Sequence, residues 1–390
     1  MNFPLGYPLL ATTLARLVLN VVLRMFYPFL PTFSRSLGVP IEHVIRLLSL
    51  RSALAMSAPF FGRLHDRFGW PNIMLAAVIV LAAALSAMAL WPGYTFFVVV
   101  LMLGMGAQFM FLPAQQAYLS ELVPYAQRGR VIAISELAWS GALLTGVPLV
   151  GWLLAHAATP EAGLPRPFGM LALVSAAVAG MLWWALPRMA VSSGRRSTAC
   201  FHWKPILTNS RVLAALVLGV LISGANENLN VVFAAWLEKS FGLALTALGL
   251  ATGIIGAAEL LGEGGVMALS DRLGKRRTIA IGVGLSTLTY LALPVLGRTL
   301  TGALAGLFLV YLTFEFAIVA TLPLMTELAP VGRARVMSVN IAGLSLGRML
   351  GALLGGVLLP LGIRATGIAA AGINVAALAV LLFWVREADG

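Results

Sequence analysis

The sequence predicts an all-α membrane protein, with twelve transmembrane helices arranged as two pseudo-symmetric bundles of six. Three observations support this fold class: the composition, the succession of long apolar runs, and an internal repeat. Of the 390 residues, 60% are hydrophobic and 10% are charged, and the mean hydropathy is +0.95. Because soluble domains are far less apolar, we expect lipid to be the solvent for most of the chain.

The apolar runs are each long enough to cross a bilayer, which takes about 20 residues of α-helix. The first six predicted spans are Tyr7 to Phe33, Ile41 to Phe61, Asn72 to Trp91, Tyr94 to Leu119, Val131 to Ala157 and Phe168 to Leu186. The second six are Val212 to Leu237, Leu245 to Ser270, Thr278 to Leu296, Thr301 to Met325, Val336 to Leu361 and Ala365 to Val385. We therefore expect a first bundle over residues 1–186, a cytoplasmic linker over 187–211 and a second bundle over 212–390.

The positive charge of the chain predicts its orientation rather than a nucleic-acid partner. The formal net charge is +12; of the 26 Lys and Arg, 16 fall on the loops and tails of one side, 5 on the other side and 5 within spans. By the positive-inside rule, both termini are expected in the cytoplasm. Arg16 and Arg24 interrupt the first apolar run, so we expect it to remain as a helix and not to be removed as a signal peptide. The single cysteine, Cys200, excludes an intrachain disulfide and a cysteine-based metal cluster.

The two halves of the chain repeat each other in sequence. Leu64-x-Asp66-Arg67-x-Gly69, between the second and third spans, recurs as Leu269-x-Asp271-Arg272-x-Gly274 at an offset of 205 residues. Three further positions return at the same offset: Arg130 as Arg335, Gly146 as Gly351, and Gly151 as Gly356. Two six-helix repeats explain this pattern, and such repeats are typical of transporter folds.

The repeated loop resembles the signature of the major facilitator superfamily, in which a Gly, an Asp-Arg pair and a second Gly are followed by basic residues. The second copy keeps Lys275, Arg276 and Arg277, whereas Trp70 and Pro71 replace them in the first. The resemblance implies a secondary transporter fold, and a cytoplasmic latch that holds the outward-facing state together. The expected gating residues are Gly62, Asp66, Arg67, Gly69, Arg130, Asp271 and Arg272. Topology-setting charge is the alternative interpretation of this loop.

Two other segments bear on the mode of transport. Gly146-Val-Pro148-Leu-Val-Gly151 resembles the antiporter motif of that family, with one residue between the first Gly and the Pro. Val100 stands where proton-driven drug antiporters of the family carry an Arg. On the eleventh span, Gly343, Gly347, Gly351 and Gly355 recur every fourth residue, which predicts close helix packing. A sliding surface between the halves is the alternative.

Ionisable residues within the spans are candidate functional groups, because an unpaired charge in hydrocarbon is unfavourable by several kcal/mol. On the first span, Arg16, Asn20 and Arg24 are spaced i, i+4, i+8, and Tyr27 falls in the same arc. The other embedded positions are Arg46, Arg51 and Glu136 in the first half, and Asn226, Glu227, Asn228, Asn230, Glu259, Glu263, Glu315 and Arg348 in the second. By chain order, the embedded charges sum to +3 in the first half and to −3 in the second.

The family resemblance implies a central cavity lined by the first, fourth, seventh and tenth spans. The expected substrate-binding residues are Arg16, Asn20, Arg24, Tyr27, Arg51, Gln108, Asn226 and Asn230. Glu227 or Glu315 is expected to carry a coupling proton, with Glu259 and Glu263 as further candidates, because burial favours the protonated form of a carboxylic acid. The alternative is that these groups form structural pairs, for example Arg348 with Glu259 or Glu263.

These features predict a secondary transporter and not an enzyme. The sequence has no Walker loop for ATP and no recognisable metal-ligand pattern among its four histidines, so we expect no cofactor. We expect a monomer in the cytoplasmic membrane that moves a small molecule by alternating access, with protons as the coupling ion. Efflux of a drug-like or amphiphilic compound is favoured. The alternatives are a uniporter, symporter or exchanger of organic anions, and a non-transporting receptor or lipid-handling scaffold with the same fold.

Overall fold

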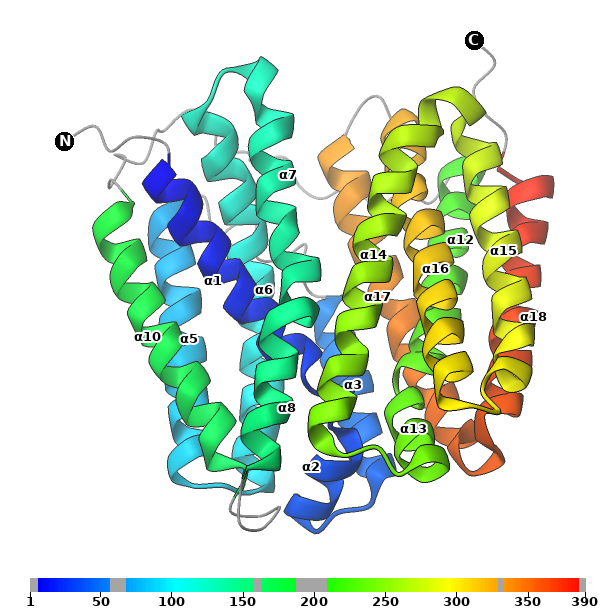
Figure 1. Cartoon of the computed structure of the whole chain (residues 1–390). Helices are drawn as coiled ribbons and strands as arrows, with labels where there is room; N and C mark the ends of the chain where they lie inside the picture. Colours follow the sequence, from blue (N-terminus) through cyan, green and yellow to red (C-terminus); the bar gives the residue numbers. More distant parts are fainter. Residues whose placement is uncertain (1–5, 57–67, 157–162, 187–208, 329–332, 386–390) are drawn as a thin grey trace. The chain divides into compact units, whose positions relative to one another are not determined.

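The computed structural model describes residues 6–56, 68–156, 163–186, 209–328 and 333–385, and within these ranges all regular secondary structure is helical (Figure 1). Each of the twelve predicted spans contains at least one helix. Ten stretches of the described chain are long and apolar enough to cross a membrane. The longest, Val336–Phe383, contains the eleventh predicted span and most of the twelfth. The second predicted span is represented by a helix of 15 residues, Ile41–Ala55, and residues 57–61 of that span lie outside the described residues.

Packing divides the described helices into two compact units. The first unit comprises α1 (Gly6–Arg24), α2 (Leu30–Leu37), α5 (Trp70–Leu90), α6 (Tyr94–Leu122), α7 (Tyr125–Gly141), η2 (Ala142–Gly146), α8 (Val147–Ala155), α10 (Pro165–Ala185) and the start of α14 (Leu245–Leu273) as far as Gly253. The second unit comprises α3 (Ile41–Ala55), α12 (Ser210–Asn230), α13 (Phe233–Phe241), α14 from Ile254, α15 (Lys275–Leu296), α16 (Leu300–Leu328), α17 (Arg333–Leu358), η3 (Leu359–Leu361) and α18 (Gly362–Phe383). The predicted linker lies outside the described residues except at its end, so the division in chain order stays a prediction.

Two segments pack with the other half of the chain: α3 belongs to the second unit, and the start of α14 belongs to the first. Both segments pack against equivalent positions of the sequence repeat. In the second unit, α3 packs against α17, where a methyl group placed on Gly356 would lie 3.1 Å from the Ile45 side chain. In the first unit, α8 packs against the start of α14, where a methyl group on Gly151 would lie 3.2 Å from the Cα of Gly249. Because Gly151 and Gly356 are equivalent positions of the repeat, both copies use the same glycine for a close helix contact.

The first long helix of each repeat is interrupted at a similar position of the repeat. In the first unit, α1 ends at Arg24 and α2 begins at Leu30, because Pro28 and Pro31 lack the N–H groups that would continue the helix. In the second unit, the break between α12 and α13 spans only Val231 and Val232. The short helices that follow, α2 and α13, end on left-handed glycines, Gly38 with φ 64° and Gly242 with φ 62°.

Aromatic side chains bury the interruption in the first unit. Phe26 and Phe29 lie within the break, and Phe33 follows on α2; all three are fully buried. The rings of Phe26 and Phe33 pack against Phe97 on α6, with both centroid distances 5.3 Å. The non-helical backbone is thus enclosed by protein, which is the condition under which irregular structure is stable at membrane depth.

The glycine stripe of α17 packs against α12 within the second unit. A methyl group on Gly347 would lie 2.2 Å from the carbonyl oxygen of Val220, and one on Gly351 would lie 2.3 Å from that of Gly224. The predicted close packing is therefore confirmed, and its partner helix belongs to the same unit. Gly355 lies beside the break between α12 and α13, since a methyl group placed on it would lie 2.5 Å from the Val231 side chain.

Candidate functional site

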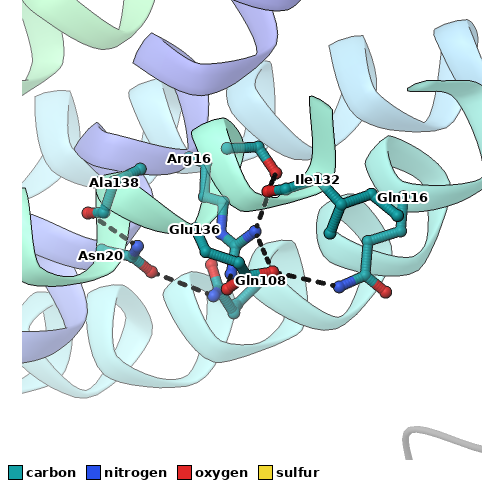
Figure 2. A network of polar contacts seen from close by, with 8 residues as sticks. Arg16, Asn20, Gln108, Gln116, Ile132, Glu136 and Ala138 are labelled. Atoms are coloured by element: carbon teal, nitrogen blue, oxygen red, sulfur yellow. Dashed lines mark hydrogen bonds and ion pairs between the residues drawn. The ribbon is translucent and has the colours of Figure 1, made fainter. Parts of the chain in front are cut away.

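The polar stripe of the first span forms an ion pair within the first unit (Figure 2). Arg16 on α1 binds Glu136 on α7 through both ends of its guanidinium: Nη1 donates to Oε1 at 2.8 Å, and Nη2 donates to the second carboxylate oxygen. Arg16 is 4% exposed, whereas the Glu136 side chain is 37% exposed. Gln116 on α6 donates to the same carboxylate at 3.4 Å. Arg16 thus forms a structural pair with Glu136, which is the alternative interpretation that the sequence left open for the embedded charges.

Asn20, one turn after Arg16, joins three helices. Its Nδ2 donates to the carbonyl oxygen of Ala138 on α7 at 3.1 Å, and its Oδ1 accepts from Nε2 of Gln108 on α6 at 3.1 Å (Figure 2). Asn20 is fully buried and Gln108 is 8% exposed. Two predicted substrate-binding residues, Asn20 and Gln108, therefore bind each other and hold α1, α6 and α7 together.

Arg24 lies at the last residue of α1, where the helix is interrupted. It is 9% exposed, and its guanidinium carbon lies 4.3 Å from the ring centroid of Trp139 on α7, a cation–π geometry. Tyr27, half-buried, lies within the interruption. Sequence reasoning missed Trp139. Its position one turn after Glu136 would have been the only signal, because residues at i and i+3 share a helix face.

The second unit holds a buried acid bound by a neutral side chain. Glu227 on α12 is 2% exposed, and its Oε2 accepts from Nδ2 of Asn230 at 3.3 Å. The Oδ1 of Asn230 accepts in turn from the hydroxyl of Tyr311 on α16 at 2.6 Å. Tyr311 is 1% exposed, so the chain of hydrogen bonds from α16 to the carboxylate is largely shielded from solvent.

A second tyrosine binds the neighbouring asparagine. The hydroxyl of Tyr290 on α15 donates to Oδ1 of Asn226 at 3.4 Å, one turn before Asn230 on α12. Asn228 points elsewhere, since its Nδ2 donates to the carbonyl oxygen of Thr366 on α18 at 3.0 Å. α12 stays helical through Asn230, and the interruption follows directly afterwards. Neither tyrosine was found from sequence, because each lies on a different helix.

The remaining acids of the second unit lie on α14 and α16. Glu315 is 7% exposed and follows Tyr311 by one turn, whereas Glu259 on α14 is 2% exposed. The two helices are in close contact here, because a methyl group on Gly262 would lie 2.9 Å from Cβ of Glu315. Glu263, half-buried, follows Gly262 directly. The suggested pairing of Arg348 with Glu259 or Glu263 stays a prediction.

The predicted contrast in embedded charge between the halves depends on how the helices pack. Arg51, 3% exposed, and Arg46, exposed, both lie on α3 and so belong to the second unit. In packing terms, the first unit carries Arg16 and Arg24 against Glu136, and the second carries three arginines against four glutamates. The embedded charges therefore sum to +1 in the first unit and −1 in the second, in place of +3 and −3 in chain order. The embedded charge of each unit is nearly balanced, unlike the polarised site expected from the sequence.

Of the seven predicted gating residues, the structure fully describes three: Gly69, Asp271 and Arg272. Gly62, Asp66 and Arg67 lie outside the described residues, as does the side chain of Arg130 on α7. Gly69 (φ 76°, ψ 153°) precedes α5 and Gly274 (φ 81°, ψ 147°) precedes α15, so the two copies of the loop end in the same backbone conformation. Both values of φ lie in the region that favours glycine. Asp271 and Arg272 are exposed at the end of α14.

The second copy of the loop carries an exposed ion pair. The Nζ of Lys275 binds Oε1 of Glu327 at the end of α16. Trp70 occupies the position equivalent to Lys275 in the first copy.

The part of the chain that the structure describes has no group of three or more His, Cys, Asp or Glu side chains that could hold a metal ion.

Comparison with known proteins places these features in a family. The sequence pattern described as "Major Facilitator Superfamily" matches residues 12–226 and 215–390. "Inner membrane transport protein YdhP" of Escherichia coli (strain K12) is 26% identical over 394 residues, with 98% of this chain and 96% of that protein covered.

A local sequence match and a solved structure complete the comparison. "Niacin transporter NiaP" of Acinetobacter baylyi is 34% identical over 122 residues, which are 29% of this chain and only 26% of that protein. The crystal structure of a D-xylose-proton symporter superposes with a TM-score of 0.82 at 15% identity, covering 98% of each chain, which shows a shared fold.

Proposed function

The chain belongs to the Major Facilitator Superfamily, whose members are secondary transporters of small molecules, and on this premise we propose that it exports amphiphilic compounds across the cytoplasmic membrane in exchange for protons. The supporting observation is the buried carboxylate of Glu227, held by Asn230 beside the interruption of α12. A carboxylic acid buried within a membrane span is a candidate proton-binding group, because its charge is unfavourable there unless it is paired, hydrated or neutralised. Interrupted helices also form the substrate sites of many transporters.

The ion pair of the first unit favours a neutral or cationic amphiphile over an anion. Arg16 donates through both ends of its guanidinium to Glu136, so the pair presents little net charge to a substrate. In the second unit, the hydroxyls of Tyr290 and Tyr311 bind Asn226 and Asn230, which precede and follow Glu227 on α12. Aromatic faces and a carboxylate are the groups that recognise organic cations. Glu315, Glu259 and Glu263 are further candidates for proton transfer in this proposal.

Transport of an organic anion is the second candidate, and Arg24 is the observation that favours it. Arg24 is a buried cation at the interruption of α1, with Trp139 stacked on one face. An arginine can bind a carboxylate through two parallel hydrogen bonds. The partial match to a niacin transporter supports the same candidate. Tyr27 in the interruption, and Arg51 on α3, are its other proposed binding residues.

The two candidates differ in which compound elicits a proton flux in proteoliposomes loaded with a pH-sensitive dye. For export by exchange, a cationic amphiphile such as ethidium releases protons from the lumen, and Glu227→Gln reduces this flux at least tenfold, equivalent to about 1.4 kcal/mol or more. Glu42→Gln, an exposed acid at the start of α3, is the matched control and keeps the wild-type flux. For anion transport, nicotinate elicits the flux instead, and Arg24→Ala abolishes it. A normal ethidium response in Glu227→Gln contradicts the proposed coupling.

The proposed orientation places both termini, and the linker 187–211, in the cytoplasm. Cys200 is the single cysteine of the chain and falls in this linker, so the native sequence contains its own topology probe. A membrane-impermeant maleimide is expected to label inverted vesicles and to leave intact cells unlabelled. Labelling of intact cells would contradict the proposed orientation.

We propose that the transporting unit is a monomer. Light scattering of the purified protein tests this proposal.

The repeated loop is proposed to act as the latch of the outward-facing state. Gly69 and Gly274 permit the tight turns, and Asp271 and Arg272 are accessible charges at the end of α14. Asp66 and Arg67 are their counterparts in the first repeat. Arg130 and Gly62 complete the proposed set. Replacing Asp66 by Asn is expected to slow transport without loss of protein from the membrane, whereas an unchanged rate would assign the loop to topology alone.

A further inference from the structure

One arginine of the second unit lies within a spanning helix, on a side that does not face lipid. Arg348 is half-buried in the middle third of α17. Leu350 and Val357 are 49% and 73% exposed, and apolar side chains exposed on a spanning helix are solvated by lipid. Val357 follows Arg348 by nine residues, about two and a half turns, so the two lie on opposite sides of α17. A charge at this depth that faces away from lipid marks a candidate binding site.

Two packed helices of the same unit flank this side of α17. Gly351, three residues after Arg348, contacts α12, where a methyl group would lie 3.0 Å from Cβ of Glu227. Gly356, eight residues after Arg348, contacts α3, where a methyl group would lie 3.1 Å from the Ile45 side chain. Around the helix surface these two contacts lie to either side of Arg348, about 60° and about 80° away. The Arg348 side chain therefore extends from α17 between α12 and α3.

The same face of α17 reaches the interruption between α12 and α13. Gly355 follows Arg348 by seven residues, about two turns, and so shares its face. A methyl group on Gly355 would lie 2.6 Å from the carbonyl oxygen of Asn228 and 2.5 Å from the Val231 side chain. Glu227 directly precedes Asn228. An embedded cation on α17 and a buried acid on α12 thus lie beside the same interruption.

We propose that Arg348 binds a carboxylate of the transported compound, so that the substrates are zwitterionic amphiphiles, with a cationic group and an acid on one molecule. The cationic half of this substrate class rests on the proposed function, in which Glu227 recognises an organic cation. Arg348 adds the site for the acid on the neighbouring helix. A cationic amphiphile alone, or an organic anion alone, occupies only one of the two groups.

The guanidinium of Arg348 is suited to a carboxylate by its shape and its constant charge. It presents two parallel N–H donors to the two carboxylate oxygens, and it stays protonated throughout the physiological pH range. Within the membrane their attraction is stronger than in water, because the dielectric constant of the surroundings is lower. The bound carboxylate also offsets the unfavourable energy of a cation at this depth. A compound without the acid is therefore expected to bind less tightly.

A structural ion pair of Arg348 with Glu259 or Glu263 is the competing interpretation. In such a pair, removing the guanidinium leaves an acid of α14 without its partner and lowers stability. In the proposed role, Arg348→Gln removes an embedded cation from the substrate-free protein, and the melting temperature is expected to stay the same or to rise. The melting temperature of this variant without ligand therefore distinguishes the two interpretations.

Ciprofloxacin and its methyl ester are the matched probes, because both carry the same cationic amine and only the first carries a carboxylate. Isothermal titration calorimetry of the protein in lipid nanodiscs at neutral pH, with empty nanodiscs subtracted, measures both affinities. We expect the wild type to bind ciprofloxacin at least about tenfold more tightly than the ester, as for one charged hydrogen-bonded pair. In Arg348→Gln, the affinity for ciprofloxacin is expected to fall to that of the ester, and the affinity for the ester is expected to stay the same.

Two further variants are controls for this comparison. Arg364→Gln removes an exposed arginine near the start of α18 and is expected to keep the preference for ciprofloxacin. Arg348→Lys keeps the charge but loses the forked donors, so its preference is expected to lie between those of the wild type and Arg348→Gln. Equal affinities for the two compounds in the wild type, no binding of either one, or an unchanged preference in Arg348→Gln would each overturn the inference.

The ethidium assay separates this inference from the proposed function. Ethidium carries no acid, so its proton flux is expected to persist in Arg348→Gln, whereas a flux elicited by ciprofloxacin is lost. An ethidium flux together with equal affinities for ciprofloxacin and its ester overturns only the role of Arg348. If ethidium elicits no flux but the preference for ciprofloxacin depends on Arg348, the proposed exchange is overturned and the carboxylate site stands.

Discussion

Each packing unit buries an ionisable side chain on the first long helix of its repeat, Arg16 on α1 and Glu227 on α12. Arg16 is bound by a group of opposite charge, Glu136, and the pair joins two helices. Glu227 accepts a hydrogen bond from the amide of Asn230, and that amide accepts one from the phenol of Tyr311. A buried ion pair is disrupted when either member loses its charge. The comparison therefore contrasts an ion pair that holds two helices together with an acid that, in the proposed function, exchanges the coupling proton.

Removing Glu136 tests the structural assignment and has the largest expected effect on stability. Glu136→Ala leaves the guanidinium of Arg16 buried without its carboxylate, which is expected to lower the free energy of unfolding by about 3 kcal/mol. This value is at the lower end for a buried pair because the Glu136 side chain is 37% exposed. Denaturant titration in lipid bicelles measures the change.

Replacing both members of the pair provides the control. In Arg16→Leu with Glu136→Leu, no buried charge remains, so the double variant is expected to unfold within about 1 kcal/mol of the wild type. If it is as unstable as Glu136→Ala, the loss arises from packing and not from an uncompensated charge. If the double variant also keeps transport, Arg16 is not a substrate ligand.

A second comparison uses the equivalent glycines Gly146 and Gly351, which face different atoms. A methyl group on Gly351 would lie 2.3 Å from the backbone oxygen of Gly224, which cannot move without displacing α12. One on Gly146 would lie 2.1 Å from a terminal methyl group of Val21, which can shift. Gly351→Ala is expected to lower the free energy of unfolding by about 2 kcal/mol and Gly146→Ala by about 1 kcal/mol.

Gly284 supplies the control for both glycine variants. It lies within α15, and a methyl group there would have no neighbour within 4 Å. Gly284→Ala is therefore expected to be neutral or slightly stabilising, because alanine has the higher helix propensity. Equal destabilisation by Gly146→Ala and Gly351→Ala would contradict the expectation that a contact with backbone tolerates a methyl group less well than a contact with a side chain.

The smallest expected effect concerns the ion pair at Lys275, whose equivalent position in the first repeat is Trp70. Lys275 and Glu327 have side chains that are 29% and 54% exposed, so solvent screens their attraction. Lys275→Ala is expected to change the free energy of unfolding by less than about 1 kcal/mol. A larger loss would indicate that this pair, which Trp70 replaces in the first repeat, stabilises the end of the loop beyond a surface contact.

Much of the fold could be predicted because it depends on local composition and spacing. Each predicted span contains a helix, since a run of about 20 apolar residues in lipid must satisfy its backbone hydrogen bonds internally. The glycine stripe on α17 likewise predicted a close contact, because small side chains at every fourth residue lie on one face. The repeat predicted equivalent glycines, and Gly151 and Gly356 both lie at close helix contacts.

The partners of the polar side chains could be predicted only in part. The spacing of Arg16, Asn20 and Arg24 correctly placed them on one face of α1, but the sequence does not specify which helix meets that face. Glu136 was identified as an embedded acid without its partner, and Trp139 and Tyr311 were missed. The missing information is long-range, since Arg16 and Glu136 are 120 residues apart.

The sequence by itself determined the solvent of this protein, its helices, its internal repeat and the identity of its embedded charges. Only the tertiary structure decided that α3 packs with the second unit, that Arg16 is bound by Glu136, and that Tyr311 reaches Glu227 through Asn230. The physical reason is that helix formation in lipid depends on neighbours three or four residues away. The state of a buried charge depends instead on whichever distant side chain the packing brings within hydrogen-bond distance.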